Sequence, residues 1–242
     1  MELDIRPVGD SALTIVFGNR IAPEINEAVA RARRYLKERG VWGVTEYVQT
    51  YASLMVHYDP FRIRYEELVF LLQEAFAEME GEEKEGQGKT LLIPVCYGGE
   101  YGPDLDFVCQ HTGLSREEVI SRHSSETYRI YMLGFLPGFV YLGGMDPSLS
   151  TPRLKSPRKE VPMGAVGIAG GQTGVYPMAS PGGWQLIGRT PLRLYDPQRE
   201  EAILYEPGDF IRFVAINEEE FLLVQQQVDN GTYTYDLVRE GE

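Results

Sequence analysis

Apolar and polar positions in the first third of the chain follow two different periods. Apolar residues recur at three- and four-residue spacing after Ile25 and again after Tyr65, which predicts two amphipathic helices, the first ending at Gly40. Short β-rich runs lie at 12–17, 44–48 and 53–58. The predicted order is roughly β-β-α-β-β-α. We therefore expect residues 1–80 to form a small α+β domain, with two helices on an antiparallel sheet.

The pattern breaks at residues 81–89. Their sequence, GEEKEGQGK, has no apolar residue and several charges. Such a segment has nothing to contribute to a hydrophobic core, so it predicts a solvated linker and a domain boundary. A second domain is then expected at 90–242.

The second domain begins with helical signals and continues with β signals. Two short helices are predicted at 103–112 and 115–123, and Ser115 with Glu118 has the spacing of a capping box. A further short helix is predicted at 218–227. The strand candidates are 91–95, 129–133, 165–169, 184–188, 192–195, 210–214 and 232–237. Many short strands with dense Gly and Pro between them predict a mainly β domain, closed or nearly closed as a barrel.

Several motifs, in order, resemble those of one family. They are GDSAL (9–13), CYGGEYGPDL (96–105), GFLPGFVYLGG (134–144), TPR (151–153), SPR (156–158), GGQTGVYP (170–177), SPGGWQLIGRTP (180–191) and PGDFIRF (207–213). They are similar to motifs of the KipI/PxpB family, whose members are also called allophanate hydrolase subunit 1 or carboxyltransferase-domain proteins of the C/D type. The resemblance covers nearly the whole chain. It implies a compact α+β domain followed by a cyclophilin-like barrel.

The resemblance also implies work within a complex. PxpB members form one component of a bacterial 5-oxoprolinase, a multi-component lactam hydrolase that uses ATP to open 5-oxoproline to glutamate. The implied partners are a PxpC/KipA-like companion and a PxpA/LamB/YcsF-like subunit, and we expect no activity from this chain alone. Two alternatives stay open: a KipI-like inhibitor of a sporulation histidine kinase, and a partner subunit in urea or allophanate metabolism. The chain has no biotin-attachment motif and no amidase Ser-Ser-Lys signature.

His123 and Arg158 are the first two candidate site residues. His123 lies between a predicted helix and a strand, where an imidazole can transfer a proton or position a substrate; the alternative is a packed histidine. Arg158 belongs to the one local concentration of positive charge in an acidic chain, together with Arg153, Lys155 and Lys159. A guanidinium on a proline-stiffened loop can grip a carboxylate or phosphate, although a solvated basic loop is the simpler interpretation.

Gln172 and Tyr176 are the other two candidates. They lie in GGQTGVYP, which we expect to face SPGGW at the mouth of the barrel. Gln172 can both donate to and accept from a lactam, while Tyr176 and Trp184 can wall a small ring. The alternative is that the glycines serve turns and Trp184 belongs to the core.

Composition and charge limit the partners, cofactors and location that we expect for this chain. A net charge of −13 over 242 residues opposes a nucleic-acid or anionic-membrane partner. There is no GxxxxGK[ST] phosphate loop, no metal-ligand clustering among the three histidines, and too few cysteines for a disulfide framework. The amino terminus lacks an export signal and no long apolar stretch is present, so we expect a cytoplasmic protein.

Overall fold

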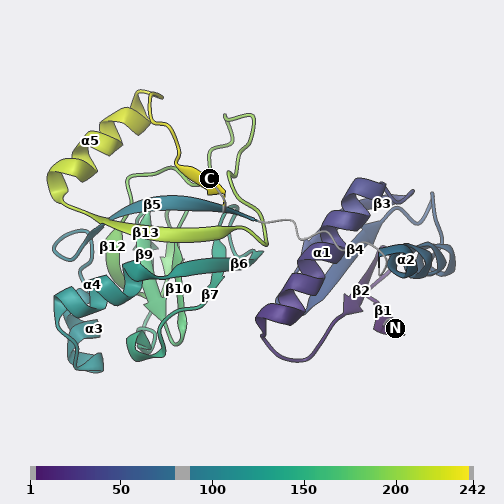
Figure 1. Cartoon of the computed structure of the whole chain (residues 1–242), viewed down its shortest axis with the longest axis horizontal. Coiled ribbons are helices and arrows are strands. Elements are labelled where there is room, and N and C mark those ends of the chain that lie inside the picture. Colours follow the sequence, from purple (N-terminus) through teal and green to yellow (C-terminus); the bar gives the residue numbers. More distant parts are fainter. Residues whose placement is uncertain (1–3, 80–87, 240–242) are drawn as a thin grey trace. The chain divides into compact units, whose positions relative to one another are not determined.

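The chain divides into two compact units, Met1–Gly86 and Gln87–Glu242, each with its own core (Figure 1). The computed structural model describes residues 4–79 and 88–239. Most of the predicted linker at 81–89 lies outside the described residues. Its last residue, Lys89, begins the first strand of the second unit instead.

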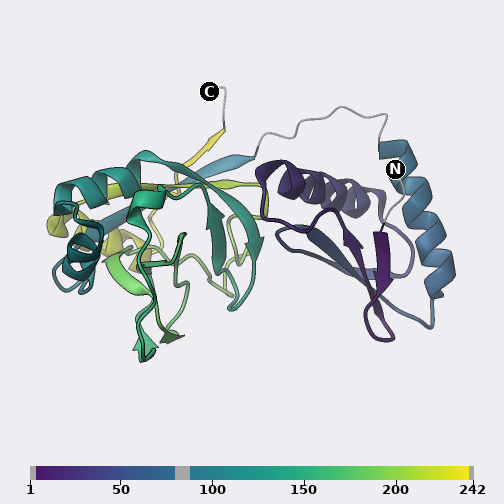
Figure 2. The same cartoon turned by 90° about the horizontal axis from the view of Figure 1, so that it is seen from below.

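The first unit is an α+β domain, as predicted. Its elements are β1 (Asp4–Pro7), β2 (Ala12–Val16), α1 (Pro23–Arg39), β3 (Val44–Gln49), β4 (Ser53–Tyr58) and α2 (Tyr65–Met79). The strands form an antiparallel sheet in the order β1-β2-β4-β3, and α1 crosses one face of it (Figures 1 and 2). Helix α1 ends where the sequence predicted, because Gly40 adopts a left-handed φ of 64° and its N–H bonds to Leu36.

The second unit is built mainly from strands. Its elements are β5 (Lys89–Tyr97), α3 (Leu105–Thr112), α4 (Arg116–Ser125), β6 (Thr127–Leu133), β7 (Val140–Gly143), η1 (Pro147–Leu149), β8 (Arg158–Val161), β9 (Ala165–Ala169), β10 (Gln172–Val175), β11 (Ser180–Gly182), β12 (Gln185–Arg189), β13 (Phe210–Ile216), α5 (Glu218–Asp229) and β14 (Leu237–Arg239). Helices α3 and α4 lie together, and α5 lies on the other side of β5 (Figure 1). The predicted capping box of Ser115 and Glu118 is present at the start of α4.

The main sheet of this unit is a nearly closed, mixed barrel. Its strand order is β10-β9-β12-β5-β13-β6-β7, and β10 at one end also lies beside β7 at the other. Strand β13 pairs with β5 in parallel, whereas the other neighbours are antiparallel. The remaining β14 pairs with the start of β5, and β8 pairs with β11 as a separate two-stranded ladder. The barrel prediction is confirmed.

Two of the predicted strands are wrong. The segment 192–195 makes only a single bridge, between Tyr195 and Ile203, although Leu192 and Leu194 are buried. Its apolar alternation reflects burial of a loop against the core. The segment 232–237 is also not a strand; β14 begins only at Leu237. None of the helices in the described part of the chain combines the length and apolar composition that crossing a bilayer requires.

Neighbouring residues on the barrel strands enter two different apolar clusters, because side chains on a strand alternate between its faces. The main core includes Val140, Ile168, Val175 and Ile187. A second cluster, here called the aromatic cluster, consists of Phe139, Val161, Ala165, Ala169, Tyr176, Trp184 and Leu186. Strands β9 and β12 contribute alternate residues to both clusters. The second face of these strands is therefore buried as well.

Candidate functional site

Strand β10 separates the candidate residues into two groups. Thr173 and Val175 are fully buried, and Val175 belongs to the main core. Gln172 and Gly174 alternate with them and so lie on the other face. A Cβ atom added at Gly174 would meet the ring of Trp184 at 3.2 Å, so this face is the one covered by the aromatic cluster. Gln172 and Tyr176 therefore share the face of Trp184.

Tyr176 and Trp184 bring the two predicted loops together. Their ring centroids lie 6.1 Å apart, and each ring also meets Phe139 edge to face at 5.5 Å. Gly182 of SPGGW is needed for this contact, because a Cβ there would lie 2.5 Å from the hydroxyl oxygen of Tyr176. GGQTGVYP and SPGGW thus meet through a buried aromatic contact, with both rings nearly inaccessible to solvent.

One residue with a strained backbone adjoins the aromatic cluster. Phe135 has a φ of 64°, a value that non-glycine residues rarely adopt and that costs about 1–3 kcal/mol. Its ring meets Phe139 edge to face at 5.4 Å, yet the residue is 62% exposed. Hydrogen bonds within the loop, from Leu136 N to Gly134 O and from Phe139 N to Leu136 O, hold this conformation. The loop thereby fixes an aromatic side chain at the edge of the cluster.

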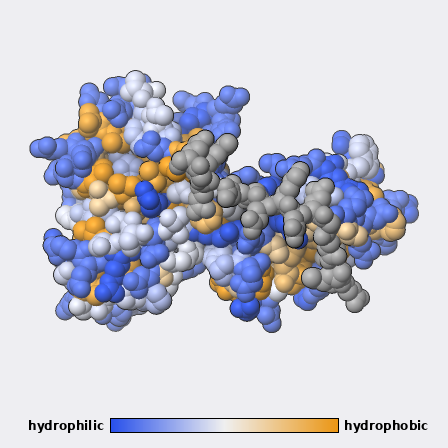
Figure 3. All heavy atoms as spheres, viewed as in Figure 1, coloured by the Kyte–Doolittle hydropathy of each residue, from blue (hydrophilic) through white to orange (hydrophobic). Residues whose placement is uncertain are grey.

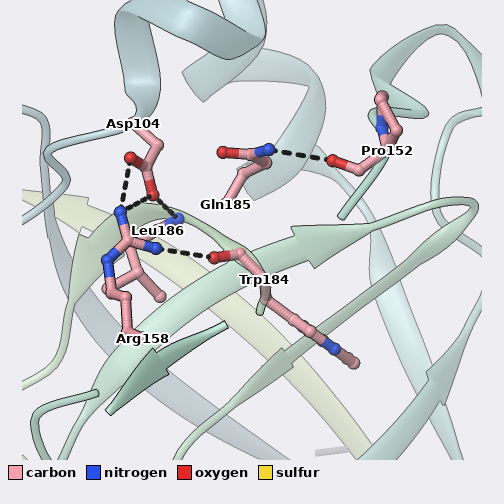
Figure 4. Close-up of polar contacts among 6 residues, drawn as sticks. All are labelled: Asp104, Pro152, Arg158, Trp184, Gln185 and Leu186. Atoms are coloured by element: carbon pink, nitrogen blue, oxygen red, sulfur yellow. Dashed lines mark hydrogen bonds and ion pairs between the residues drawn. The ribbon is translucent and has the colours of Figure 1, made fainter. Parts of the chain in front are cut away.

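Arg158 is held by an internal ion pair rather than left free (Figure 4). Its Nη2 donates to both carboxylate oxygens of Asp104 at 2.7 Å, and its Nη1 donates to the backbone oxygen of Trp184 at 3.2 Å. Asp104 also accepts from the backbone N–H of Leu186 at 2.7 Å. Both side chains are largely buried. The pair therefore ties the start of α3 to β8 and β12.

Arg153 also contacts Trp184, but at the indole ring, whereas Arg158 contacts the backbone oxygen. The Arg153 guanidinium lies over the ring of Trp184, 6.0 Å from the centroid, and the residue is exposed. Burial raises the pKa of the Tyr176 hydroxyl, while a hydrogen bond from the Trp184 backbone and the positive charges of Arg153 and Arg158 act in the opposite direction. The net effect keeps the Tyr176 hydroxyl neutral near neutral pH. Sequence reasoning placed Arg153 in the basic segment but favoured Arg158 over it as the contact for an anion.

His123 lies on the opposite face of β10 from Gln172. Its Nδ1 is 2.7 Å from the Tyr97 hydroxyl and its Nε2 is 2.7 Å from Thr173 Oγ1, which donates in turn to Gly167 O at 3.1 Å. Because the Thr173 proton is directed to Gly167, we assign the proton of the imidazole to Nε2, with Tyr97 donating to Nδ1. The ring also stacks on Phe213, with centroids 4.6 Å apart.

The environment of His123 keeps it neutral. The side chain has no exposed surface, and burial lowers its pKa to about 3. The structure therefore does not bring His123 together with Gln172, Tyr176 and Arg158. Its predicted role in proton transfer stays a prediction, whereas its contacts favour the alternative of a packed histidine that joins α4, β5 and β10.

Asp104 is the site residue that sequence reasoning missed. It lies within the motif CYGGEYGPDL, but 54 positions separate it from Arg158, and nothing in the local pattern indicates the pairing. The described residues contain no group of three or more His, Cys, Asp or Glu side chains placed to hold a metal ion. Cys96 and Cys109 are both unpaired thiols.

Apolar side chains also reach the surface away from this site. In the first unit an open groove of about 610 Å³ is lined by Trp42, Phe70 and Leu71 with charged neighbours. In the second unit Leu222 and Leu223 of α5 are more than half exposed, and Figure 3 shows apolar surface over this helix. Surfaces of this kind are typical of proteins that bind partners.

Comparison with known proteins gives one consistent family. Residues 3–205 match the family described as "Carboxyltransferase domain, subdomain C and D". The chain is 44% identical over 227 residues to the 5-oxoprolinase B subunit of Bacillus subtilis, covering 90% of this chain and 94% of that protein. It is 24% identical over 265 residues to urea amidolyase of Saccharomyces cerevisiae, covering 96% of this chain but 14% of that protein.

A solved structure shares the fold over most of the chain. The crystal structure of TTHA0988 superimposes with a TM-score of 0.76 at 36% sequence identity and covers 85% of this chain. The match spans only 40% of the length of TTHA0988.

Proposed function

Because this chain belongs to the carboxyltransferase domain family, subdomains C and D, we propose that it is the B subunit of a 5-oxoprolinase. The observation that carries this proposal is the 44% identity to a protein of that name, since it extends over nearly the full length of both chains. The matched region includes both units, so the proposal concerns the whole chain. The reaction is the opening of 5-oxoproline to glutamate, driven by ATP.

On this chain, the proposed substrate-binding face carries Gln172, Tyr176 and Arg158. Gln172 offers an amide that can donate to and accept from a lactam. Tyr176 and Trp184 give the face a rigid aromatic base, and Arg158 fixes the backbone of Trp184. A rigid base of this kind lowers the cost of orienting a small substrate. For His123 the proposed role is to hold β10, because its ring has no exposed surface.

ATP would transfer a phosphoryl group to the lactam carbonyl oxygen and leave as ADP; two water molecules would then open the ring C–N bond and release phosphate, giving glutamate. The sequence has no phosphate loop of the GxxxxGK[ST] type, and we assign ATP to the complex without naming residues for it on this chain. The companion subunits are of the PxpC/KipA and PxpA/LamB/YcsF types. The exposed apolar surfaces on both units are consistent with work in a complex.

The test is reconstitution. The purified chain is assayed alone and with both companion subunits for glutamate formed from 5-oxoproline in the presence of ATP. We expect glutamate only from the assembled complex. Turnover by the chain alone would contradict the subunit role, and an assembled complex inert toward 5-oxoproline would contradict the substrate.

A role in urea metabolism is the second candidate, since urea amidolyase matches nearly the whole chain at lower identity. The same assay, with urea and allophanate offered in place of 5-oxoproline, distinguishes this role from the proposed one. The proposed function requires 5-oxoproline to be the substrate that is consumed. Binding and inhibition of a histidine kinase is checked in parallel by autophosphorylation of the kinase with and without the chain.

A further inference from the structure

The two arginines of the segment 151–158 differ in what their guanidinium groups can still bind. Arg158 is largely buried and already paired with Asp104 and the backbone of Trp184. Arg153 is exposed, and none of the ion pairs between described residues includes it. An arginine whose donors are already used has little to offer an anion. Arg153 is therefore the better placed of the two to bind one.

The backbone on both sides of Arg153 is fixed by contacts with other strands. Thr151 pairs with Gly170 through two backbone hydrogen bonds, of 3.3 and 2.7 Å. The oxygen of Pro152 accepts from the buried side chain of Gln185 at 2.9 Å (Figure 4). On the other side, Leu154 N donates to Gly183 O at 2.8 Å. Anchors before and after Arg153 limit the conformational entropy lost when its side chain binds a ligand.

The position of the guanidinium over Trp184 leaves its hydrogen-bonding edge available. The guanidinium carbon lies 6.0 Å from the centroid of the indole ring, and none of the hydrogen bonds or ion pairs between described residues uses its five N–H donors. That edge matches the two oxygens of a carboxylate. Trp184 is itself held, because its backbone oxygen accepts from Arg158 and its ring packs on Tyr176 and Phe139.

We propose that Arg153 binds the carboxylate of a small lactam carboxylate substrate, and that Arg158 with Asp104 is a positioning pair that holds Trp184 beneath it. The assignment of the lactam rests on the proposed function. The carboxylate site itself rests on the exposed, anchored guanidinium. Arg153 thereby distinguishes 5-oxoproline from the same ring without a carboxyl group.

The experiment uses Trp184 as the reporter. The chain has two tryptophans, so Trp42→Phe in the first unit leaves Trp184 as the single tryptophan. In this background, 5-oxoproline and 2-pyrrolidinone, which lacks the carboxylate, are titrated into the isolated chain and into the reconstituted complex. Arg153→Ala is compared with Lys155→Ala. Lys155 is also exposed, lies two positions further along the chain and carries the same charge. Circular dichroism checks that each variant is folded.

We expect a saturable change in Trp184 fluorescence with 5-oxoproline and a response at least about tenfold weaker with 2-pyrrolidinone, since a charge-assisted hydrogen bond is lost. Arg153→Ala should weaken 5-oxoproline binding by about tenfold or more and remove the difference between the two lactams. Lys155→Ala should stay within about twofold of the parent. In the complex, Arg153→Ala should raise KM for 5-oxoproline by a similar factor and change kcat little.

Three binding results would each overturn the inference, as would the complete lack of a response given next: unchanged affinity in Arg153→Ala, equal binding of the two lactams by the parent, or Arg153-dependent binding of ATP in place of 5-oxoproline. No carboxylate response in either the chain or the complex would do the same. The proposed function fails separately. If the complex does not convert 5-oxoproline but acetate binds in an Arg153-dependent way, the function is lost and the carboxylate site stands. If conversion proceeds with unchanged KM in Arg153→Ala, the site is lost and the function stands.

Discussion

The two units bury different kinds of side chain. Within the described residues, the first unit buries only two polar side chains, Asn26 and Gln49, and its core is otherwise apolar. The second unit buries eight: Thr90, His123, Thr151, Thr173, Ser180, Gln185, Thr190 and Asp209. A buried polar group costs free energy unless it is hydrogen-bonded, so such groups restrict a fold to the arrangement that satisfies them. The second unit therefore depends more than the first on a particular arrangement of hydrogen-bonded side chains.

The polar contacts of the second unit also span long stretches of sequence. Arg158 and Asp104 lie 54 positions apart, and His123 and Thr173 lie 50 apart. These contacts support the strands that carry the candidate site, whereas the first unit is stabilised mainly by helix and strand packing. Chemistry that needs fixed side chains is therefore expected in the second unit, and the apolar core of the first unit is expected to serve stability.

The largest effect is expected when apolar packing is removed from the first unit. Leu72→Ala truncates a fully buried side chain on α2 and should lower the free energy of unfolding of that unit by about 2–5 kcal/mol, because it leaves a cavity. Phe70→Ala on the same helix, where the side chain is mostly exposed, should cost far less. Hydrogen exchange of α1 and α2 measures both. Equal loss of protection in the barrel strands would contradict the separation of the two cores.

The next largest effect is expected when the ion pair of Asp104 and Arg158 is broken. Asp104→Ala leaves the Arg158 guanidinium and the Leu186 N–H without their acceptor, and should destabilise the second unit by roughly 2–3 kcal/mol. Asp106→Ala is a matched control. Its carboxylate also binds an arginine, Arg116, through two bonds of 2.6 Å, but both side chains are more than half exposed.

The control should cost much less than Asp104→Ala, because exposed ion pairs contribute little to stability. Urea unfolding in the Trp42→Phe background, followed by Trp184 fluorescence, compares the two variants. Similar losses for Asp104→Ala and Asp106→Ala would mean that burial of the Arg158 pair adds nothing to stability.

A third change adds one methyl group between the two loops. Gly182→Ala places a Cβ 2.5 Å from the Tyr176 hydroxyl oxygen, and should destabilise the second unit by about 1–3 kcal/mol through overpacking. Gly171→Ala, where a Cβ would meet no atom within 4 Å, is the control and should change stability little. The same unfolding measurement applies. A neutral Gly182→Ala would show that Tyr176 can move aside, and that the aromatic base of the site is adaptable.

The smallest effect concerns pH. The pKa of His123 is lowered by burial to about 3, below its ordinary value of about 6.5, so the unfolded chain binds the proton more readily than the folded one. The contribution of neutral His123 to the free energy of unfolding is fully present above about pH 6.5 and is lost as the pH falls toward about 3. Between pH 6.5 and 5 the second unit should lose about 1–2 kcal/mol.

His123→Gln tests the origin of this slope, since glutamine does not titrate. Unfolding of the variant and the parent is compared at pH 6.5, 5.75 and 5, above most carboxyl pKa values. The variant is expected to be less stable at pH 6.5 but to show a flatter profile. An identical slope in the two proteins would remove His123 as its cause.

Elements whose signals are local could be predicted from the sequence alone. The helical spacing of apolar residues in α1 and α2, the glycine that ends α1 at Gly40 and the capping box of Ser115 each depend on residues a few positions apart. Dense turns between short apolar runs also predicted the barrel. The motifs GGQTGVYP and SPGGW pointed to the loops that meet at Tyr176 and Trp184.

The partners that these residues take depend on how the chain folds, and local patterns do not reveal them. Apolar alternation does not distinguish a strand from a buried loop, so 192–195 was predicted as a strand. The face of β10 that each side chain occupies depends on how the sheet closes, and this places His123 in the main core and Gln172 on the opposite face. The pairing of Asp104 with Arg158, which leaves Arg153 exposed, depends on bringing α3 against β12. Charge and residue type are written in the sequence, but whether a guanidinium is already paired is a property of three-dimensional neighbours.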